Sequence, residues 1–213
     1  MDTRDRILGR VRKGLSRVPG RAGGGTAARY IADHPCGPRP RFDVPLVDMF
    51  TQRADALTTS VERLEHPDKV PAAVAQYLAG IGVSPAVTVW AGLASLDWAG
   101  AGVEAAVRRA RDGDAVGVTG AYCAIAETGT LMMLSGPETH ASVSLLPETH
   151  VAILSASRIV PCMEDAWTLL RSEHGVPPRA VNFISGPSRT ADIEQTVTLG
   201  AHGPYRVHVL IVP

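Results

Sequence analysis

The chain has 213 residues, of which 45% are hydrophobic and 20% are charged, a balance typical of a soluble globular protein with one core. This composition excludes a fibrous or largely disordered protein. Lysine plus arginine and aspartate plus glutamate both total 21, so the chain lacks the net positive charge with which most nucleic-acid binders attract phosphates. We therefore expect no nucleic-acid partner.

The three cysteines, Cys36, Cys123 and Cys162, are far apart in the sequence. They form no CxxC pair, so the chain by itself offers too few clustered thiols for a zinc ribbon or a four-cysteine iron–sulfur cluster. Their odd number favours a reducing compartment. No apolar run approaches the ~18 residues that a membrane span needs. We expect a cytoplasmic protein with no membrane span, no metal and no cofactor of its own.

Residues 1–41 form a basic segment with ten basic and three acidic side chains. Apolar residues recur there at helical spacing, at Ile7, Val11, Leu15 and Val18. This spacing predicts an amphipathic helix over residues 3–18, which either faces solvent or docks on an acidic partner. Residues 19–41 contain five glycines and four prolines, which favour a flexible connector without regular structure. We predict that one α/β domain follows over residues 42–213.

From residue 44 onward the predicted elements alternate between helix and strand. We expect helices over 44–59 and 71–78 and strands over 61–64 and 87–90. Short apolar runs predict further strands over 123–126, 131–134, 151–154, 181–184 and 207–212, and a late helix over 163–171 with Trp167 and Leu170 toward the core. This alternation is typical of a mostly parallel sheet with helices on its faces.

Three polar, glycine-containing segments follow predicted apolar runs, where an open α/β sheet places its ligand crevice. The first, residues 126–130, reads Ala-Glu-Thr-Gly-Thr. Glu127 is a candidate catalytic carboxylate, and the candidate ligand contacts beside it are Thr128, Gly129 and Thr130. A plain hairpin turn explains Gly129 equally well.

The second segment, residues 185–194, is expected to open a short helix. Gly186 would let the backbone approach a ligand, and Ser188 could cap the helix. Free N–H groups at this helix start, with Arg189 as the counter-charge, would bind an oxyanion. The predicted contacts are Ser185, Gly186, Ser188, Arg189, Thr190 and Asp192. Alternatively, Arg189 pairs with Asp192 or Glu194 on its own helix.

The third segment, residues 200–204, is a tight loop before the last strand. His202 could act there as an acid or base near neutral pH, and Gly203 is a further candidate contact.

Two Pro-Glu-Thr-His tetrapeptides, residues 137–140 and 147–150, have a spacing that matches no known metal geometry. The residues thus predict an anion-binding pocket without a defined reaction.

The segments AIAETGT, SLLPETHVAIL, NFISGPSRTADIE and GAHGPYRVHVLIV resemble, in this order and spacing, the lactate-utilization protein C family, also called the LUD domain. The resemblance covers residues 112–212 most strongly, and RDRILGRVRKGL is similar to that family's first helix. It implies a fold similar to the glucosamine-phosphate isomerase, ribose-phosphate isomerase and coenzyme A transferase superfamily. It also implies a subunit without a cluster, acting with iron–sulfur and cysteine-rich partner subunits that oxidise L-lactate to pyruvate.

Three functions stay open at this point. The chain is an accessory subunit of such a lactate-oxidising system, which the resemblance favours. Alternatively, it is a stand-alone transferase or isomerase in which Glu127 is the nucleophile or general base. The third alternative is a regulatory module that binds a small anionic metabolite without turnover.

Overall fold

The computed structural model describes residues 3–15, 25–35, 37, 42–190 and 198–213. The chain divides into two units, residues 1–40 and 41–213, and each is described by itself. In the first unit, α1 spans Thr3–Leu15 and α2 spans Gly25–Asp33. The helix predicted over 3–18 is confirmed as far as residue 15, and residues 16–18 lie outside the described part.

The prediction that residues 19–41 lack regular structure is wrong at α2. Between its glycine-rich and proline-rich flanks, this segment contains Ala-Ala-Arg-Tyr-Ile-Ala, and alanine is the strongest helix former. Arg29 and Asp33, one helical turn apart, form an ion pair of 3.5 Å on the exposed surface, which adds a small stabilisation to the helix.

In the described part of the second unit, six parallel strands lie side by side in the order β1, β12, β7, β4, β2, β3. Their bounds are β1 Thr59–Arg63, β2 Ala86–Val89, β3 Glu104–Val107, β4 Val116–Gly120, β7 Thr149–Ser155 and β12 Arg206–Val212. Each neighbouring pair is parallel. The predicted mostly parallel sheet is therefore confirmed.

Both faces of this sheet are covered, as the continuous apolar runs of its central strands require. Along β12, Val209 and Ile211 belong to the core on one face, whereas Leu210 and Val212 belong to the core on the other. The helix α4 (Val70–Gly80) covers the second of these faces. A proline in its first turn is compatible with the helix start, where backbone N–H groups have no partner within the helix.

The other face of the parallel sheet packs against α3 (Leu46–Ala56) and a second sheet. Four described strands form this sheet in the order β8, β5, β6, β9. Their bounds are β5 Cys123–Ile125, β6 Thr130–Leu134, β8 Ile159–Val160 and β9 Val181–Ile184. β6 pairs antiparallel with both β5 and β9. The helix α6 (Met163–His174) covers the far face of this sheet.

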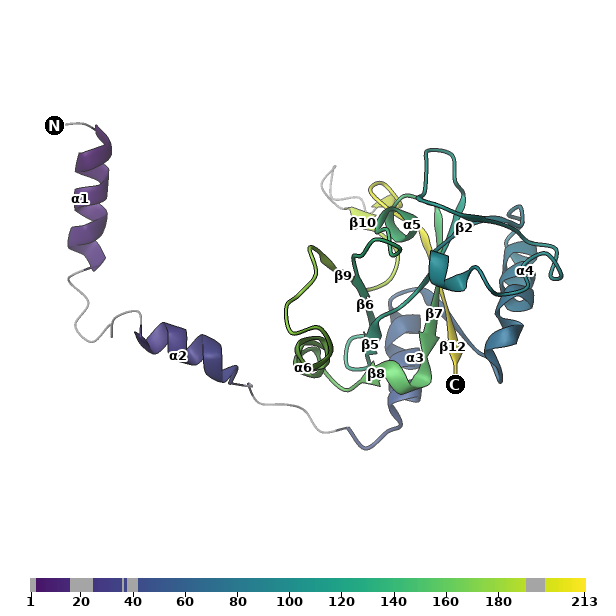
Figure 1. Ribbon diagram of the computed structural model, residues 1–213, viewed down its shortest axis with the longest axis horizontal. Helices are drawn as coiled ribbons and strands as arrows, with labels where there is room; N and C mark the ends of the chain where they lie inside the picture. The colour runs from purple at the N-terminus through teal and green to yellow at the C-terminus, as the bar shows by residue number, and fades with distance from the viewer. Residues whose placement is uncertain (1–2, 16–24, 36, 38–41, 191–197) are drawn as a thin grey trace. The chain divides into compact units, whose positions relative to one another are not determined.

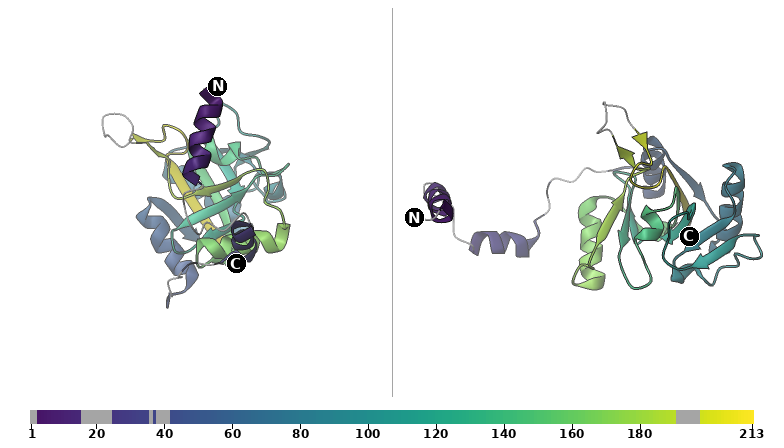
Figure 2. Two further views of the ribbon diagram at one scale, coloured as in Figure 1. Left: turned by 90° about the vertical axis from the view of Figure 1, so that its left-hand side faces the viewer. Right: turned by 90° about the horizontal axis from the view of Figure 1, so that it is seen from above.

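The domain therefore consists of layers, with α4 and α6 on its two outer sides and both sheets between them (Figures 1 and 2). The described part of this unit also contains several short elements. They are η1 Pro67–Lys69, η2 Ala91–Leu93, α5 Ser142–Leu145, η3 Ala156–Arg158, β10 Arg189–Thr190 and β11 Thr198–Leu199. Within the described ranges, no helix combines the length and apolarity that crossing a bilayer requires.

Most predicted elements form within a few residues of their expected bounds. In α6, Leu170 is fully buried and Trp167 packs against the same core, as predicted. The sequence did not reveal that residues 123–126, 131–134 and 181–184 belong to a separate, largely antiparallel sheet. Short apolar runs fit a buried strand in either sheet, so their pattern does not identify the partner strands.

Candidate functional site

The first predicted segment, residues 126–130, forms the hairpin turn between β5 and β6. The Glu127 N–H donates to the Pro161 carbonyl oxygen at 3.0 Å. Gly129 has a φ of +64°, and a Cβ there would lie 2.5 Å from the Ala54 backbone nitrogen in α3. Glycine is therefore required both by the turn and by its close packing against α3, as the hairpin alternative predicts.

The structure brings the first and second predicted segments together. The Thr130 and Ser185 hydroxyl oxygens are 2.7 Å apart, and the Thr128 hydroxyl donates to Thr130 Oγ1 at 2.8 Å. Gly186 has a φ of +83°, and a Cβ there would lie 2.5 Å from the Leu57 carbonyl oxygen, just beyond α3. These hydroxyls bond to one another, while Gly129 and Gly186 pack against α3 and the residue that follows it.

The helix predicted to begin at Ser188 is wrong. Arg189 and Thr190 form β10, which pairs antiparallel with β11. The Ser188 N–H donates to the Pro204 carbonyl oxygen at 2.8 Å and is therefore not free to bind an anion. Serine after Gly-Pro precedes strands as well as helices, and the sequence pattern does not separate the two. Asp192 lies outside the described residues, so its predicted contact stays a prediction.

Arg189 and His202 face different hollows. The Arg189 guanidinium donates to Thr58 Oγ1 at 2.9 Å and lines a pocket of about 390 Å³. His202 and Gly203 line another hollow of about 420 Å³. Glu127 is absent from the described residues that line these two hollows. The structure therefore does not bring Glu127 and His202 into one pocket as an acid–base pair.

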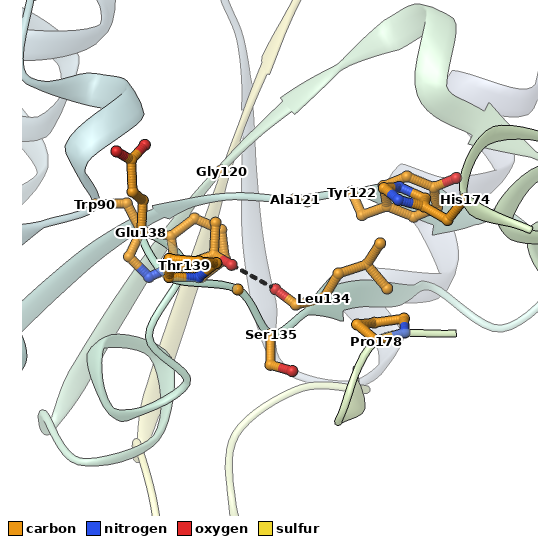
Figure 3. A pocket seen from close by; sticks show the side chains of 12 residues that line it. Trp90, Gly120, Ala121, Tyr122, Leu134, Ser135, Glu138, Thr139, His174 and Pro178 are labelled. Carbon is orange, nitrogen blue, oxygen red and sulfur yellow. Dashed lines mark hydrogen bonds between the residues drawn. The ribbon is translucent and has the colours of Figure 1, made fainter. Parts of the chain in front are cut away.

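A pocket of about 700 Å³ lies at the carboxyl ends of β2 and β4 (Figure 3). Trp90 directly follows β2, and Gly120 ends β4. Residues 134–139, which begin at the last residue of β6, form another wall, and His174 and Pro178 close the side toward α6. Ligands of α/β proteins bind preferentially at this edge of the sheet, in pockets of this size. This pocket is therefore the candidate functional site.

Hydrogen bonds hold the loop after β6 in place as a wall of this pocket. The Trp90 indole N–H donates to the His140 carbonyl oxygen at 3.0 Å. The Thr139 hydroxyl donates to the Leu134 carbonyl oxygen at 2.8 Å, the bond drawn in Figure 3. The exposed Glu138 directly precedes these two anchored residues, Thr139 and His140. The first Pro-Glu-Thr-His tetrapeptide is thus a pocket wall.

An ion pair holds Tyr122 on the side of the pocket near α6. Its hydroxyl donates to Glu173 at 2.7 Å, and Arg158 donates to both Glu173 carboxylate oxygens at 2.6 and 2.9 Å. Burial and the hydrogen bond to Glu173 raise the pKa of Tyr122 to about 12, while Arg158 lowers the pKa of Glu173 to about 2. Tyr122 therefore contributes a neutral ring whose hydroxyl is already engaged.

Few charged side chains belong to the described lining of the pocket. Its described lining contains one carboxylate, that of Glu138, one imidazole, that of His174, and no lysine or arginine. The rings of Trp90 and Tyr122 and aliphatic side chains supply much of the remaining wall. A desolvated carboxylate or phosphate needs a paired cation, so this wall is better suited to an apolar or planar group than to a small anion.

The described cysteines lie away from solvent. Burial raises the pKa of both Cys123 and Cys162 to about 11, which keeps both thiols protonated and poorly nucleophilic at neutral pH. Cys36 lies outside the described residues. No cluster of three or more His, Cys, Asp or Glu side chains suited to a metal occurs in the part of the chain that the structure covers.

Sequence reasoning placed the site elsewhere and missed most of this pocket. Trp90 could have been found, because it ends the strand predicted over 87–90 and so lies at the expected edge. Tyr122 follows β4, whose two glycines weaken the strand signal. Residues 137–140 were weighed as metal ligands and their role was left open, and no sequence signal brings His174 to this place.

The fold and pocket define a layered α/β protein with a binding pocket at the carboxyl edge of a parallel sheet. Residues 48–212 match the family model of the LUD domain, and the chain therefore belongs to the LUD domain family. The resemblance predicted from the sequence is confirmed. The further similarity to the isomerase and coenzyme A transferase superfamily stays a prediction.

Several curated relatives carry the name lactate utilization protein C. The Bacillus licheniformis protein is 35% identical over 119 residues, which cover 54% of this chain and 49% of that protein. The Bacillus subtilis protein is 41% identical over 100 residues, covering 46% and 42% of the two chains. This chain thus spans about half the length of the curated relatives it matches.

A solved structure has a similar fold. The crystal structure of a DUF162 family protein from Deinococcus radiodurans superposes with a TM-score of 0.63 and 23% sequence identity, covering 82% of this chain and all of that chain. At this level of identity the similarity establishes the fold of the domain.

Proposed function

We propose that this chain is a subunit of a cytoplasmic system that oxidises L-lactate to pyruvate and that it contains no iron–sulfur cluster of its own. The observation that carries the proposal is the match of residues 48–212 to the LUD domain, together with relatives named for lactate utilization. Oxidation of L-lactate to pyruvate releases two electrons and two protons. In this proposal, partner subunits with iron–sulfur clusters accept the electrons.

The geometry of the candidate site favours an accessory role over direct oxidation of lactate by this chain. Lactate is a small carboxylate, and its binding in a desolvated pocket requires a cation. The described lining of the 700 Å³ pocket contains no lysine or arginine. Cys123 and Cys162 are buried, which supports the view that clusters reside in the partners. We therefore assign the pocket to a larger, weakly charged group.

The test is L-lactate-dependent dye reduction in extracts of host cells that lack this chain. The proposal expects this activity to be lost on deletion and restored by the wild-type chain. Glu138→Arg, which inverts the one carboxylate of the described pocket lining, should fail to restore it. Glu65→Arg makes the same charge change at an exposed position away from the pocket and should restore it.

Wild-type rates of L-lactate oxidation without this chain would refute the proposal. Restoration by both arginine variants would refute the assignment of the pocket but not that of the system. A purified wild-type chain that associates with no iron-containing subunit at micromolar concentration would refute the proposed assembly.

A further inference from the structure

A second pocket, of about 390 Å³, lies at the opposite edge of the parallel sheet. Thr58 and Ser60 line it at the start of β1, and Arg206 lines it at the start of β12. Because β1 and β12 are parallel neighbours, their first residues share this edge. Arg189 of β10 closes the pocket from the side. The candidate site at the carboxyl edge shares no residue with it.

Two arginines, Arg189 and Arg206, therefore line one small pocket. Among the described residues, no carboxylate lies within salt-bridge distance of Arg189 or Arg206. Arg189 donates to Thr58 Oγ1 at 2.9 Å, and Arg206 makes a long contact of 3.4 Å with Thr149 Oγ1. Arg189 also donates to the Leu57 carbonyl oxygen at 3.4 Å. Each guanidinium has five N–H donors, so within the described residues most of these donors have no protein partner.

The hydroxyl groups of the pocket belong to a fixed framework. The Tyr77 ring stacks on His208, with the ring centroids 4.0 Å apart and the planes at 4°. Ser60 Oγ lies 2.8 Å from Nδ1 of the buried His208. Thr58 has a φ of +64°, a strained backbone conformation of the kind that clusters at functional sites. These contacts hold the wall of the pocket in place around the two arginines.

Two described glutamates contact residues that lie in or beside the pocket wall. Glu148 accepts a hydrogen bond from the Tyr205 hydroxyl at 3.2 Å, and Glu62 lies 3.8 Å from His208 Nε2. Neither glutamate belongs to the described lining of the pocket. The Arg206 guanidinium also lies 4.3 Å from the Tyr205 ring centroid, which holds it over an aromatic face and not over an acid.

We propose that this pocket binds the phosphate group of a small phosphorylated metabolite. Two planar guanidinium forks match the several acceptor oxygens and double charge of a phosphate better than a single carboxylate. The pocket is larger than a phosphate ion alone, and the rings of Tyr77 and Tyr205 line the remaining space. This site is independent of the proposed role in lactate oxidation.

The test is isothermal titration calorimetry of the full chain. Inorganic phosphate is titrated in one experiment and L-lactate, the alternative carboxylate ligand, in another. Arg189→Ala and Arg206→Ala should each weaken phosphate binding at least about tenfold, because each removes charge-assisted hydrogen bonds. Arg189→Lys keeps the charge but loses the planar fork and should fall between wild type and Arg189→Ala. Arg171→Ala, in α6 and outside the pocket lining, is the control and should bind like wild type.

Folding of each variant is checked by its melting temperature. Arg189 is exposed and donates only to Thr58 and Leu57 in the described part, so Arg189→Ala keeps the test decisive even if Arg206→Ala does not fold. Absence of phosphate binding at millimolar concentration, or equal affinity in wild type and Arg189→Ala, overturns the proposal. Tighter, Arg189-dependent binding of L-lactate overturns the phosphate assignment in favour of a carboxylate.

Discussion

His150 makes a specific prediction about the acid stability of this protein. It lies in the central strand β7 and is fully buried. Its Nε2 is 2.8 Å from Thr119 Oγ1, whereas its Nδ1 has no hydrogen-bond partner within the described part of the chain. Burial lowers the pKa of His150 from 6.5 to about 4. A decrease in pH should therefore lower the free energy of unfolding through this residue.

The magnitude follows from the difference between the folded and unfolded chain. Between pH 6.5 and pH 4 the unfolded chain binds a proton at His150 and the folded chain does not, so the free energy of unfolding decreases as the pH falls. At ~1.36 kcal/mol per pH unit, the full window costs about 3 kcal/mol, and the step from pH 7 to pH 5 costs about 2 kcal/mol. His208, whose pKa burial also lowers to about 4, adds a similar loss.

Urea unfolding at pH 7 and pH 5 measures this effect. We expect the wild type to lose about 4 kcal/mol between the two values from both histidines together. His150→Gln should lose about half as much, while His202→Gln, at an exposed loop position, should behave like wild type. Equal losses in wild type and His150→Gln would refute the reasoning. So would an NMR titration in which the wild-type His150 ring protonates near pH 6.5.

Three further predictions concern the pocket walls, the hairpin and the thiols. Gly129→Ala should lower the free energy of unfolding by about 2–4 kcal/mol, because its φ of +64° and its contact with α3 exclude a Cβ; a loss below about 1 kcal/mol in urea unfolding would contradict this. Glu173→Gln should lower the pKa of Tyr122 below its value of about 12, because the carboxylate helps to raise it, and phenolate absorbance in an alkaline titration measures the change. In Cys36→Ser, both remaining thiols are buried, so reaction with a disulfide reagent at neutral pH should be slow until denaturant is added; rapid labelling of the folded variant would count against their burial.

The sequence by itself determined the class of the fold and the family. Alternating helices and short apolar runs predict a parallel α/β sheet, because strands buried on both faces must be apolar throughout. β12 illustrates this, since its successive residues enter two different cores. The hairpin alternative for residues 126–130 was equally open to sequence reasoning, because a left-handed turn residue is most often glycine.

Only the tertiary structure decided which strands pair and which side chains share a pocket. An apolar run records that a segment is buried but not which neighbour buries it, so β5, β6 and β9 could not be separated from the parallel sheet. Trp90 and His174 meet in one pocket although 84 positions separate them in the sequence. Arg189 was predicted to bind an anion through a helix start, yet the structure places it in a strand, where it lines one pocket with Arg206. Such neighbours arise from packing of distant segments, and local periodicity contains no information about that packing.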